Sequence, residues 1–290
     1  MRASLTIREK TIGWWQALNP AIYLISILPG LAIFLLVPLG SSWSPILLAT
    51  VGVVLIQHGI NLMNDAMDWS RGADVEKYNS WVRYHDQSPS RARWHGLLAL
   101  GLGVAVGVWV LFQAGQLSIL AVALPLVVLG VGYNVGSKPF AYSAFSEWVT
   151  GVCYGPGVFG CLWLLSRGAN PWVGAFGCMS FAALAVAVLL SHQPSQVLTD
   201  AMVGKRSFAV RFGVDTTLRA TTLLFALSLA ALDGAYTVAL LPLPALAWVS
   251  SIALFTFFSR RRAWNPRVLL LATLGKLVFL EGLCLFGGFQ

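Results

Sequence analysis

Nine apolar runs of membrane-spanning length alternate with polar breaks along the 290-residue chain. An α-helix that crosses a bilayer needs about 17 to 25 apolar residues. Four breaks, at residues 40–42, 113–116, 167–170 and 233–234, are short and almost uncharged, whereas the other connections are longer and basic. The pattern predicts an all-α integral membrane protein with nine transmembrane helices in a single domain, residues 1–290. The expected helices cover residues 20–39, 44–64, 94–113, 117–133, 147–166, 171–191, 216–232, 235–258 and 268–289.

Composition and charge placement support this interpretation. Hydrophobic residues make up 57% of the chain and charged residues 10%, which is far from the composition of a soluble domain. Of the 19 Lys and Arg residues, 17 fall on the side that holds the N-terminus, Arg167 falls on the other, and Lys276 lies inside the last run. The asymmetry predicts a cytoplasmic N-terminus and an external C-terminus in a multi-pass protein of the inner (plasma) membrane. No basic stripe interleaves with aromatic residues, so nucleic acid is not an expected partner despite the net charge of +8.

A cluster of polar residues ends the second apolar run. At 100° per residue, Gln57, Asn61, Asn64, Asp65 and Asp68 share one face of a helix. Carboxylates are costly in hydrocarbon unless they line a cavity or meet a counter-ion, and oxygen ligands suit a hard cation such as Mg²⁺. The cluster indicates a metal-diphosphate site facing the cytoplasm. The alternative is a helix end that emerges into water.

A second polar cluster lies at residues 192–211. It joins Asp200 to the cations Lys205, Arg206 and Arg211, and Gly204 permits a tight turn just before them. A carboxylate that holds Mg²⁺ beside cations that donate to phosphate oxygens would neutralise a leaving diphosphate. The alternative is a basic cytoplasmic loop with one incidental acid.

Aromatic residues lie between the two clusters, in residues 130–156. Tyr133 and Tyr142 accompany Lys138 and Glu147 at a predicted cytoplasmic helix end. An aromatic wall suits a prenyl tail, and ring faces stabilise a carbocation as they do other cations. The alternative is that these rings belong to the interfacial aromatic belt.

Cysteines and the N-terminus carry no signal for other chemistry. Cys153, Cys161, Cys178 and Cys284 lie in apolar runs without C-x-x-C spacing, so buried free thiols are expected. The first 19 residues lack a separate apolar core with a cleavage site, so the first span itself is expected to direct insertion.

Four segments resemble the UbiA-type intramembrane prenyltransferase superfamily, and its menaquinone (1,4-dihydroxy-2-naphthoate polyprenyltransferase) branch in particular. NLMNDAMDWSRGAD resembles the first motif N-D-x-x-D with the following Gly-x-Asp. YNVGSKPFAYSAFSEW resembles the segment Y-x-x-G-P-x-P-L-x-Y-x-x-L-G-E, and TDAMVGKRSFAVRFG resembles T-D-x-x-x-G-K-R-T-L-A-V-R-L-G. WWQALNPAIYLISILPG resembles the opening helix, with Asn19 where Arg is usual. The similarity runs from about Trp14 to Gly213.

The resemblance implies helices around a central cavity and Mg²⁺-dependent transfer of a polyprenyl group from its diphosphate to an aromatic quinone precursor within the bilayer. In this reaction, Glu147 is a candidate base for the final loss of a ring proton. The site residues that it implies form three groups: Asn61, Asp65, Asp68 and Asp200 for Mg²⁺ and diphosphate; Lys138, Lys205 and Arg206 for phosphate; and Tyr133, Tyr142, Asn64 and Gln196 for the remaining substrate contacts.

The second motif departs from the family pattern N-N-x-R-D-x-x-x-D. The corresponding residues run from His192 to Asp200, with Gln196 in place of the first Asp and without the Arg. Gln196 offers a neutral oxygen but no charge, and Pro194 removes a backbone donor or kinks the helix. Three interpretations therefore stay open: a prenyltransferase with an altered donor site, a terpene cyclase of the same superfamily, or a scaffold that binds an isoprenoid or quinone.

Overall fold

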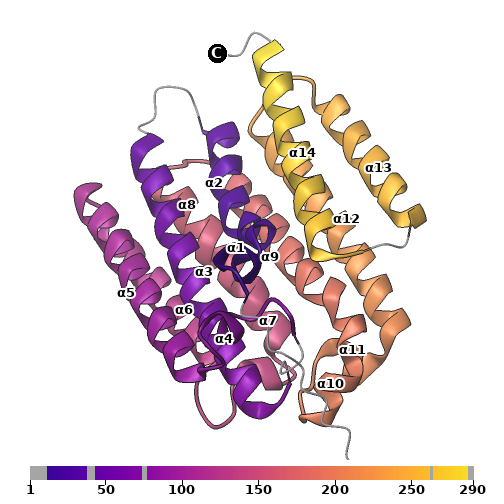
Figure 1. The fold of residues 1–290 in the computed structure, drawn as a ribbon. Coiled ribbons are helices and arrows are strands. Elements are labelled where there is room, and N and C mark those ends of the chain that lie inside the picture. Colours follow the sequence, from indigo (N-terminus) through magenta and orange to yellow (C-terminus); the bar gives the residue numbers. More distant parts are fainter. Residues whose placement is uncertain (1–11, 38–42, 74–76, 262–263, 287–290) are drawn as a thin grey trace, which may run out of the picture.

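The computed structural model describes residues 12–37, 43–73, 77–261 and 264–286, and the regular secondary structure in these residues is helical. The basic N-terminal tail, the predicted break at 40–42 and Asp74 of the first motif lie outside the described residues. The helices pack side by side as a bundle (Figure 1).

The first half of the bundle contains α1 (Trp14–Leu18), η1 (Pro20–Tyr23), α2 (Leu24–Leu36), α3 (Trp43–Arg71), α4 (Trp81–Tyr84), α5 (Pro89–Gln113), η2 (Leu117–Ile119), α6 (Leu120–Gly132) and η3 (Phe140–Tyr142). The second half contains α7 (Ser146–Val152), η4 (Cys153–Gly160), α8 (Cys161–Leu165), α9 (Pro171–His192), η5 (Gln193–Ser195), α10 (Val197–Met202), α11 (Phe208–Phe212), α12 (Val214–Val238), α13 (Pro244–Arg261) and α14 (Pro266–Phe286).

Seven helical runs in the described residues are long and apolar enough to cross a membrane. Two further apolar helices are shorter, Leu117–Gly132 and Pro244–Ser259. The first matches the fourth predicted span, and the second overlaps the eighth, which was predicted to begin nine residues earlier, at residue 235. The structure therefore supports a multi-pass membrane protein, while helix length alone accounts for seven of the nine predicted spans. The seven runs are Trp14–Leu36, Trp43–Arg71, Pro89–Gln113, Ser146–Leu165, Pro171–Ser195, Val214–Val238 and Pro266–Phe286.

Helices α3 and α5 approach closely because glycines face each other at two levels. A Cβ on Gly59 would lie 2.5 Å from the carbonyl oxygen of Gly96, and one on Gly103 would lie 2.7 Å from that of Gly52. Such contacts are typical of membrane helices, in which small residues let backbones pack together. The contact holds α3, which carries the first acidic motif, firmly against α5.

The predicted break at residues 233–234 is wrong. Helix α12 continues through Asp233 to Val238, and the chain turns between α12 and α13 instead, where Leu240 and Leu243 have positive φ. Asp233 need not reach water because its carboxylate lies 2.8 Å from the ammonium of Lys276 on α14, and both side chains are fully buried. A charge inside a span marks an ion pair here, and not a loop.

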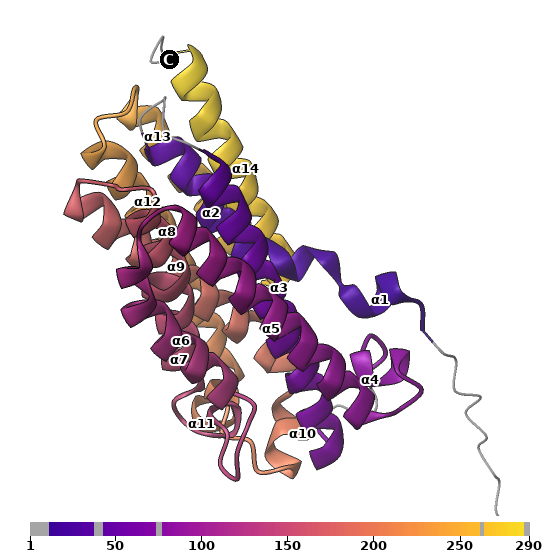
Figure 2. The ribbon, with the colours of Figure 1, turned by 90° about the vertical axis from the view of Figure 1, so that its left-hand side faces the viewer.

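The four cysteines are free thiols, as predicted, but they are partly buried and not fully buried. Both polar clusters lie at one end of the bundle, where α4, α10 and α11 gather (Figures 1 and 2). Helix α3 and the α9–α10 segment, far apart in sequence, thus deliver their acids to the same region.

Candidate active site

Asp65 projects from α3 and anchors the loop that follows it. Its Oδ1 accepts a hydrogen bond from the Lys77 ammonium at 2.8 Å, and its Oδ2 accepts one from the backbone N–H of Trp81 at 2.8 Å. The carboxylate is buried, with a side-chain exposure of 8%. These charge-assisted bonds offset the cost of removing the carboxylate from water.

Asp68 lies nearly one turn further along α3 and connects the two polar clusters. Its Oδ1 accepts from the Tyr142 hydroxyl at 2.8 Å, and its Oδ2 accepts from the Asn64 amide at 3.2 Å and from the Lys205 ammonium at 3.3 Å. The same ammonium lies 3.8 Å from Oδ1 of Asp200. One cation therefore sits between an acid of the first motif and the acid of the second.

The second cluster is shaped by a break in its helix. Pro194 lies in the 3₁₀ turn η5, after which α10 begins with Gln196 as its N-cap. The backbone N–H of Asp200 donates to the Gln196 carbonyl at 2.8 Å, so one helical turn separates the two residues, as the sequence predicts. Gly204, with φ of 73°, then reverses the chain and brings Lys205 back to Asp200.

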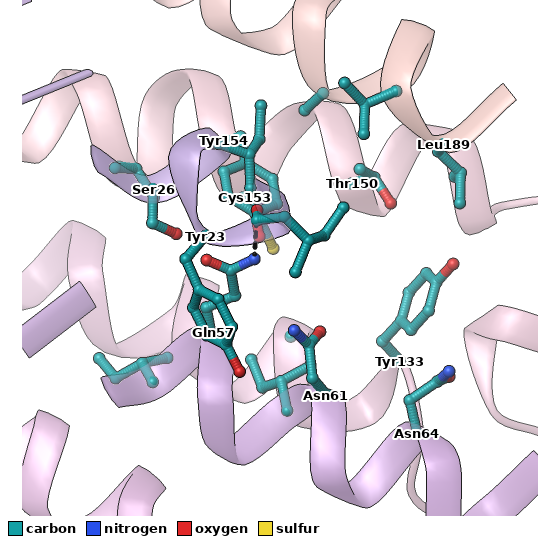
Figure 3. Close-up of a pocket in the computed structure, with 18 of the residues that line it drawn as sticks. Tyr23, Ser26, Gln57, Asn61, Asn64, Tyr133, Thr150, Cys153, Tyr154 and Leu189 are labelled. Carbon is teal, nitrogen blue, oxygen red and sulfur yellow. Dashed lines mark hydrogen bonds between the residues drawn. The ribbon is translucent and has the colours of Figure 1, made fainter. Parts of the chain in front are cut away.

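A cavity of about 800 Å³ opens beside these residues. Its polar wall includes Asn61, Asn64, Asp65, Tyr133, Gln196, Asp200 and Lys205 from the predicted site, together with Lys77. Figure 3 shows Tyr23, Gln57 and Asn61 on one side of the opening, with Tyr133 and Thr150 across from them. Away from the acids the wall is largely aliphatic, which suits a ligand with a charged end and a hydrocarbon tail.

Four predicted metal- or substrate-binding residues are not part of this wall. Asp68 is buried and contacts the cavity residue Lys205 at 3.3 Å. Tyr142 is buried and acts on the site through its bond to Asp68. Lys138 and Arg206 are exposed side chains outside the cavity lining, although the Arg206 backbone N–H donates to the Tyr142 carbonyl at 3.4 Å. Phosphate binding by these two cations stays a prediction.

Glu147 is committed to other partners. Its Oε2 accepts from Arg211 at 2.8 Å, while its Oε1 accepts from the Phe208 N–H at 3.0 Å and from the Gln193 amide at 3.4 Å. It is not among the residues that line the cavity. The contacts tie α7 to α11 and η5, so the structure favours a positioning role for Glu147 over its predicted role as a base.

Sequence patterns did not single out Lys77 and Tyr23 as site residues. Lys77 follows Asp65 by 12 positions, and no periodicity relates the two. Tyr23 lines the cavity from η1, and its hydroxyl lies 2.6 Å from Nδ1 of His58. A lone Lys or Tyr at the end of a span carries no signal of its own, because interfacial residues of both types are common there.

The donor set suits Mg²⁺, although within the described residues no three His, Cys, Asp or Glu side chains converge into a closed metal site. Mg²⁺ is usually held by one or two carboxylates together with substrate phosphates and water. Asp68 and Asp200 fit this pattern because they already hold a positive charge between them, the Lys205 ammonium. Asp65 and Asn61 add oxygen atoms along the same cavity wall.

Relatives share parts of this chain. A 1,4-dihydroxy-2-naphthoate octaprenyltransferase of Mycobacterium tuberculosis is 29% identical over 174 residues, which cover 59% of each chain. The enzyme of the same name from Haemophilus influenzae is 27% identical over 231 residues, 73% of each chain. These relatives confirm the predicted resemblance to the menaquinone branch. The match spans less than two thirds of the mycobacterial protein.

Solved structures share the fold. A UbiA homolog from Archaeoglobus fulgidus bound to GPP and Mg²⁺ has a TM-score of 0.67 at 12% identity, covering 93% of this chain and 98% of that one. The same homolog bound to DMAPP and Mg²⁺ has a TM-score of 0.64 at 14% identity. The model of the UbiA prenyltransferase family matches residues 23–274. The chain therefore belongs to the UbiA prenyltransferase family.

Proposed function

We propose that the protein transfers a polyprenyl group from its diphosphate to an aromatic quinone-precursor acceptor, in a Mg²⁺-dependent reaction within the membrane. The observation that carries this proposal is the position of Lys205 between Asp68 and Asp200, at the polar end of a cavity with a largely aliphatic far wall. The relatives named as octaprenyltransferases and the fold shared with a homolog that binds GPP and Mg²⁺ support it.

Each side chain has a role in this reaction. Asp68 and Asp200, with Asp65 and Asn61, would hold Mg²⁺, which when bound neutralises charge on the departing diphosphate. Lys205 donates to diphosphate oxygens, and its charge stabilises the leaving group. Tyr133 and Tyr23 present rings and hydroxyls to the cavity, where ring faces stabilise the allylic cation until a ring carbon of the acceptor attacks it. That carbon then loses its proton, which restores the aromatic ring.

We also propose nine spans in one domain, residues 1–290, with a cytoplasmic N-terminus, an external C-terminus and a site that faces the cytoplasm. The charge asymmetry supports this orientation. Reporter fusions after Arg93 and Arg211 are expected in the cytoplasm, and fusions at Gly168 and Gln290 outside. Cytoplasmic signals at both of the latter positions would contradict the nine-span arrangement.

The activity is tested by incubating purified protein and Mg²⁺ with geranyl, farnesyl and longer prenyl diphosphates. Each donor is tried with and without 1,4-dihydroxy-2-naphthoate or 4-hydroxybenzoate, and products are identified by mass. We expect release of diphosphate only with an acceptor, together with a prenylated ring. Hydrocarbon or alcohol formed without acceptor would identify a cyclase, and bound donor without diphosphate release would identify a scaffold.

A further inference from the structure

One glycine of the cavity wall borders empty space. Gly107 on α5 lines the cavity, and a Cβ added to it would meet no heavy atom within 4 Å. By contrast, a Cβ on Gly103, one turn earlier, would lie 2.7 Å from the Gly52 carbonyl oxygen. Helix packing therefore explains why Gly103 is small, and it does not explain Gly107.

The depth of Gly107 follows from its neighbour on α3. A Cβ on Gly52 would lie 3.5 Å from the backbone nitrogen of Gly107, so the two glycines are level with each other. Gly52 precedes Asn61 by nine residues and Asp65 by thirteen. At 1.5 Å per residue, Gly107 lies roughly 14 to 20 Å deeper than the polar end of the site.

The cavity around this level suits a hydrocarbon chain. It is lined there by small and aliphatic residues of α3, α5 and α6 and by none of the charged residues of the site: Ala49, Gly52, Val53, Gly103, Gly107, Leu111, Ala123, Leu126 and Val127. An isoprene unit adds four carbon–carbon bonds of about 1.5 Å, or about 5 Å of extended chain. A tail whose diphosphate lies at Asp65 would therefore pass Gly107 at about its third or fourth unit.

We propose that Gly107 is a specificity-determining residue, which keeps the cavity open to prenyl chains longer than about three units. This inference rests on the proposed function, because it concerns the donor of that reaction. A larger side chain at this position fills the space that the distal tail needs and leaves the diphosphate and the first two units undisturbed. Long donors are then rejected and short donors are retained.

The test is Gly107→Leu, with Gly101→Leu as its matched control. Gly101 lies on the same helix, and a Cβ there also meets nothing within 4 Å, but it does not line the cavity. For Gly107→Leu we expect kcat/KM for geranylgeranyl and longer diphosphates to fall at least about tenfold, with geranyl diphosphate little changed. Gly101→Leu should change neither value, and Gly107→Ala should have a smaller effect than Gly107→Leu.

The outcomes separate this inference from the proposed function. If wild-type protein turns over no donor of any length, the proposed function fails. If wild type is active and Gly107→Leu affects all donors equally, or none, the inference fails while the function stands. The comparison requires that Gly107→Leu is as stable as Gly101→Leu, so the thermal unfolding midpoints of both variants are measured. If Gly107→Leu is less stable, the ratio of long-donor to short-donor turnover decides, because loss of folded protein lowers both turnovers equally.

Discussion

Two of the groups of buried charges in the described residues differ in what surrounds them. Asp68, Lys205 and Asp200 meet beside a cavity, and the Lys205 side chain keeps 16% of its surface exposed. Asp233 and Lys276 are fully buried in protein, with side-chain exposures of 0%. Lys276 also donates to the Ala247 carbonyl and, at 2.7 Å, to the Ser250 hydroxyl.

The difference separates a reactive group from a structural one. The charges beside the cavity can exchange partners when a ligand enters, because one ammonium there serves two carboxylates at 3.3 and 3.8 Å. The Asp233–Lys276 pair is shut off from solvent, and its hydrogen bonds join three consecutive helices, α12, α13 and α14. An ionisable residue inside a span can therefore serve packing, by pairing with a second buried charge, as well as function.

The largest effect is expected from Asp65→Asn and Asp68→Asn. Each change is nearly isosteric but removes a charge that is worth several kcal/mol to metal binding, so turnover should fall by about 1,000-fold or more. Diphosphate release measures the loss, and thermal unfolding should be near wild type. Asp86→Asn is the control, since this exposed acid pairs with the equally exposed Arg91 at 3.0 Å and lies outside the site. Near-normal activity of both variants would show that these acids have no catalytic role and only end the helix.

Lys276→Met tests the closed pair. Removal of one partner leaves a buried carboxylate uncompensated, and the free energy of unfolding should fall by about 3–5 kcal/mol. The double variant Asp233→Leu/Lys276→Met should recover most of this loss, because two apolar residues replace the pair. Thermal unfolding in detergent measures both. A single variant as stable as wild type would show that the pair is dispensable and would remove the contrast between the two groups.

Tyr142→Phe tests a residue that acts through Asp68. The variant loses the hydroxyl that donates to Asp68 at 2.8 Å, and partners that orient a metal ligand are worth about 10- to 100-fold in affinity or activity. We therefore expect the Mg²⁺ concentration for half-maximal activity to rise by about tenfold. Tyr78→Phe, at an exposed tyrosine, should leave it unchanged. A fall in activity that saturating Mg²⁺ does not rescue would argue against positioning of the ion.

The smallest effect is expected from Gln196→Asp, which restores the family's charge count. Gln196 lines the cavity one turn before Asp200, and Mg²⁺ prefers carboxylate to carboxamide, so half-maximal activity should need severalfold less Mg²⁺. Thr199→Asp adds the same charge on the exposed side of α10 and serves as the control. An active variant with unchanged Mg²⁺ dependence would show that Gln196 does not approach the ion.

Structural features that follow from patterns repeating along the chain could be predicted well. The apolar runs located the helices, and the 100° periodicity placed Asn64, Asp65 and Asp68 together on α3, where the structure has them. The one-turn relation of Gln196 and Asp200 also follows from local geometry. Such features depend only on residues within a few turns of one another, so a single sequence contains them.

Pairings between distant segments were not predictable in the same way. The sequence predicts the end of a span at Asp233 because its partner, Lys276, lies 43 residues further on and no local pattern relates the two. Lys77 and Lys205 look alike as loop cations, yet the fold directs one to Asp65 and the other to both Asp68 and Asp200. The partners of Glu147 on α7 are likewise distant in sequence, since Phe208 and Arg211 lie on α11.

The glycine contacts between α3 and α5 also set a length. Gly52 and Gly59 are seven residues apart, as are Gly96 and Gly103, so the two backbones touch once every two turns. A slip of one residue along the axis would place side chains where only hydrogen atoms fit. The axial register of the two helices is thereby fixed, and so is the distance along α3 from its acids to the level of Gly107. Single side chains at different depths of the cavity can then select different tail lengths without any movement of the backbone.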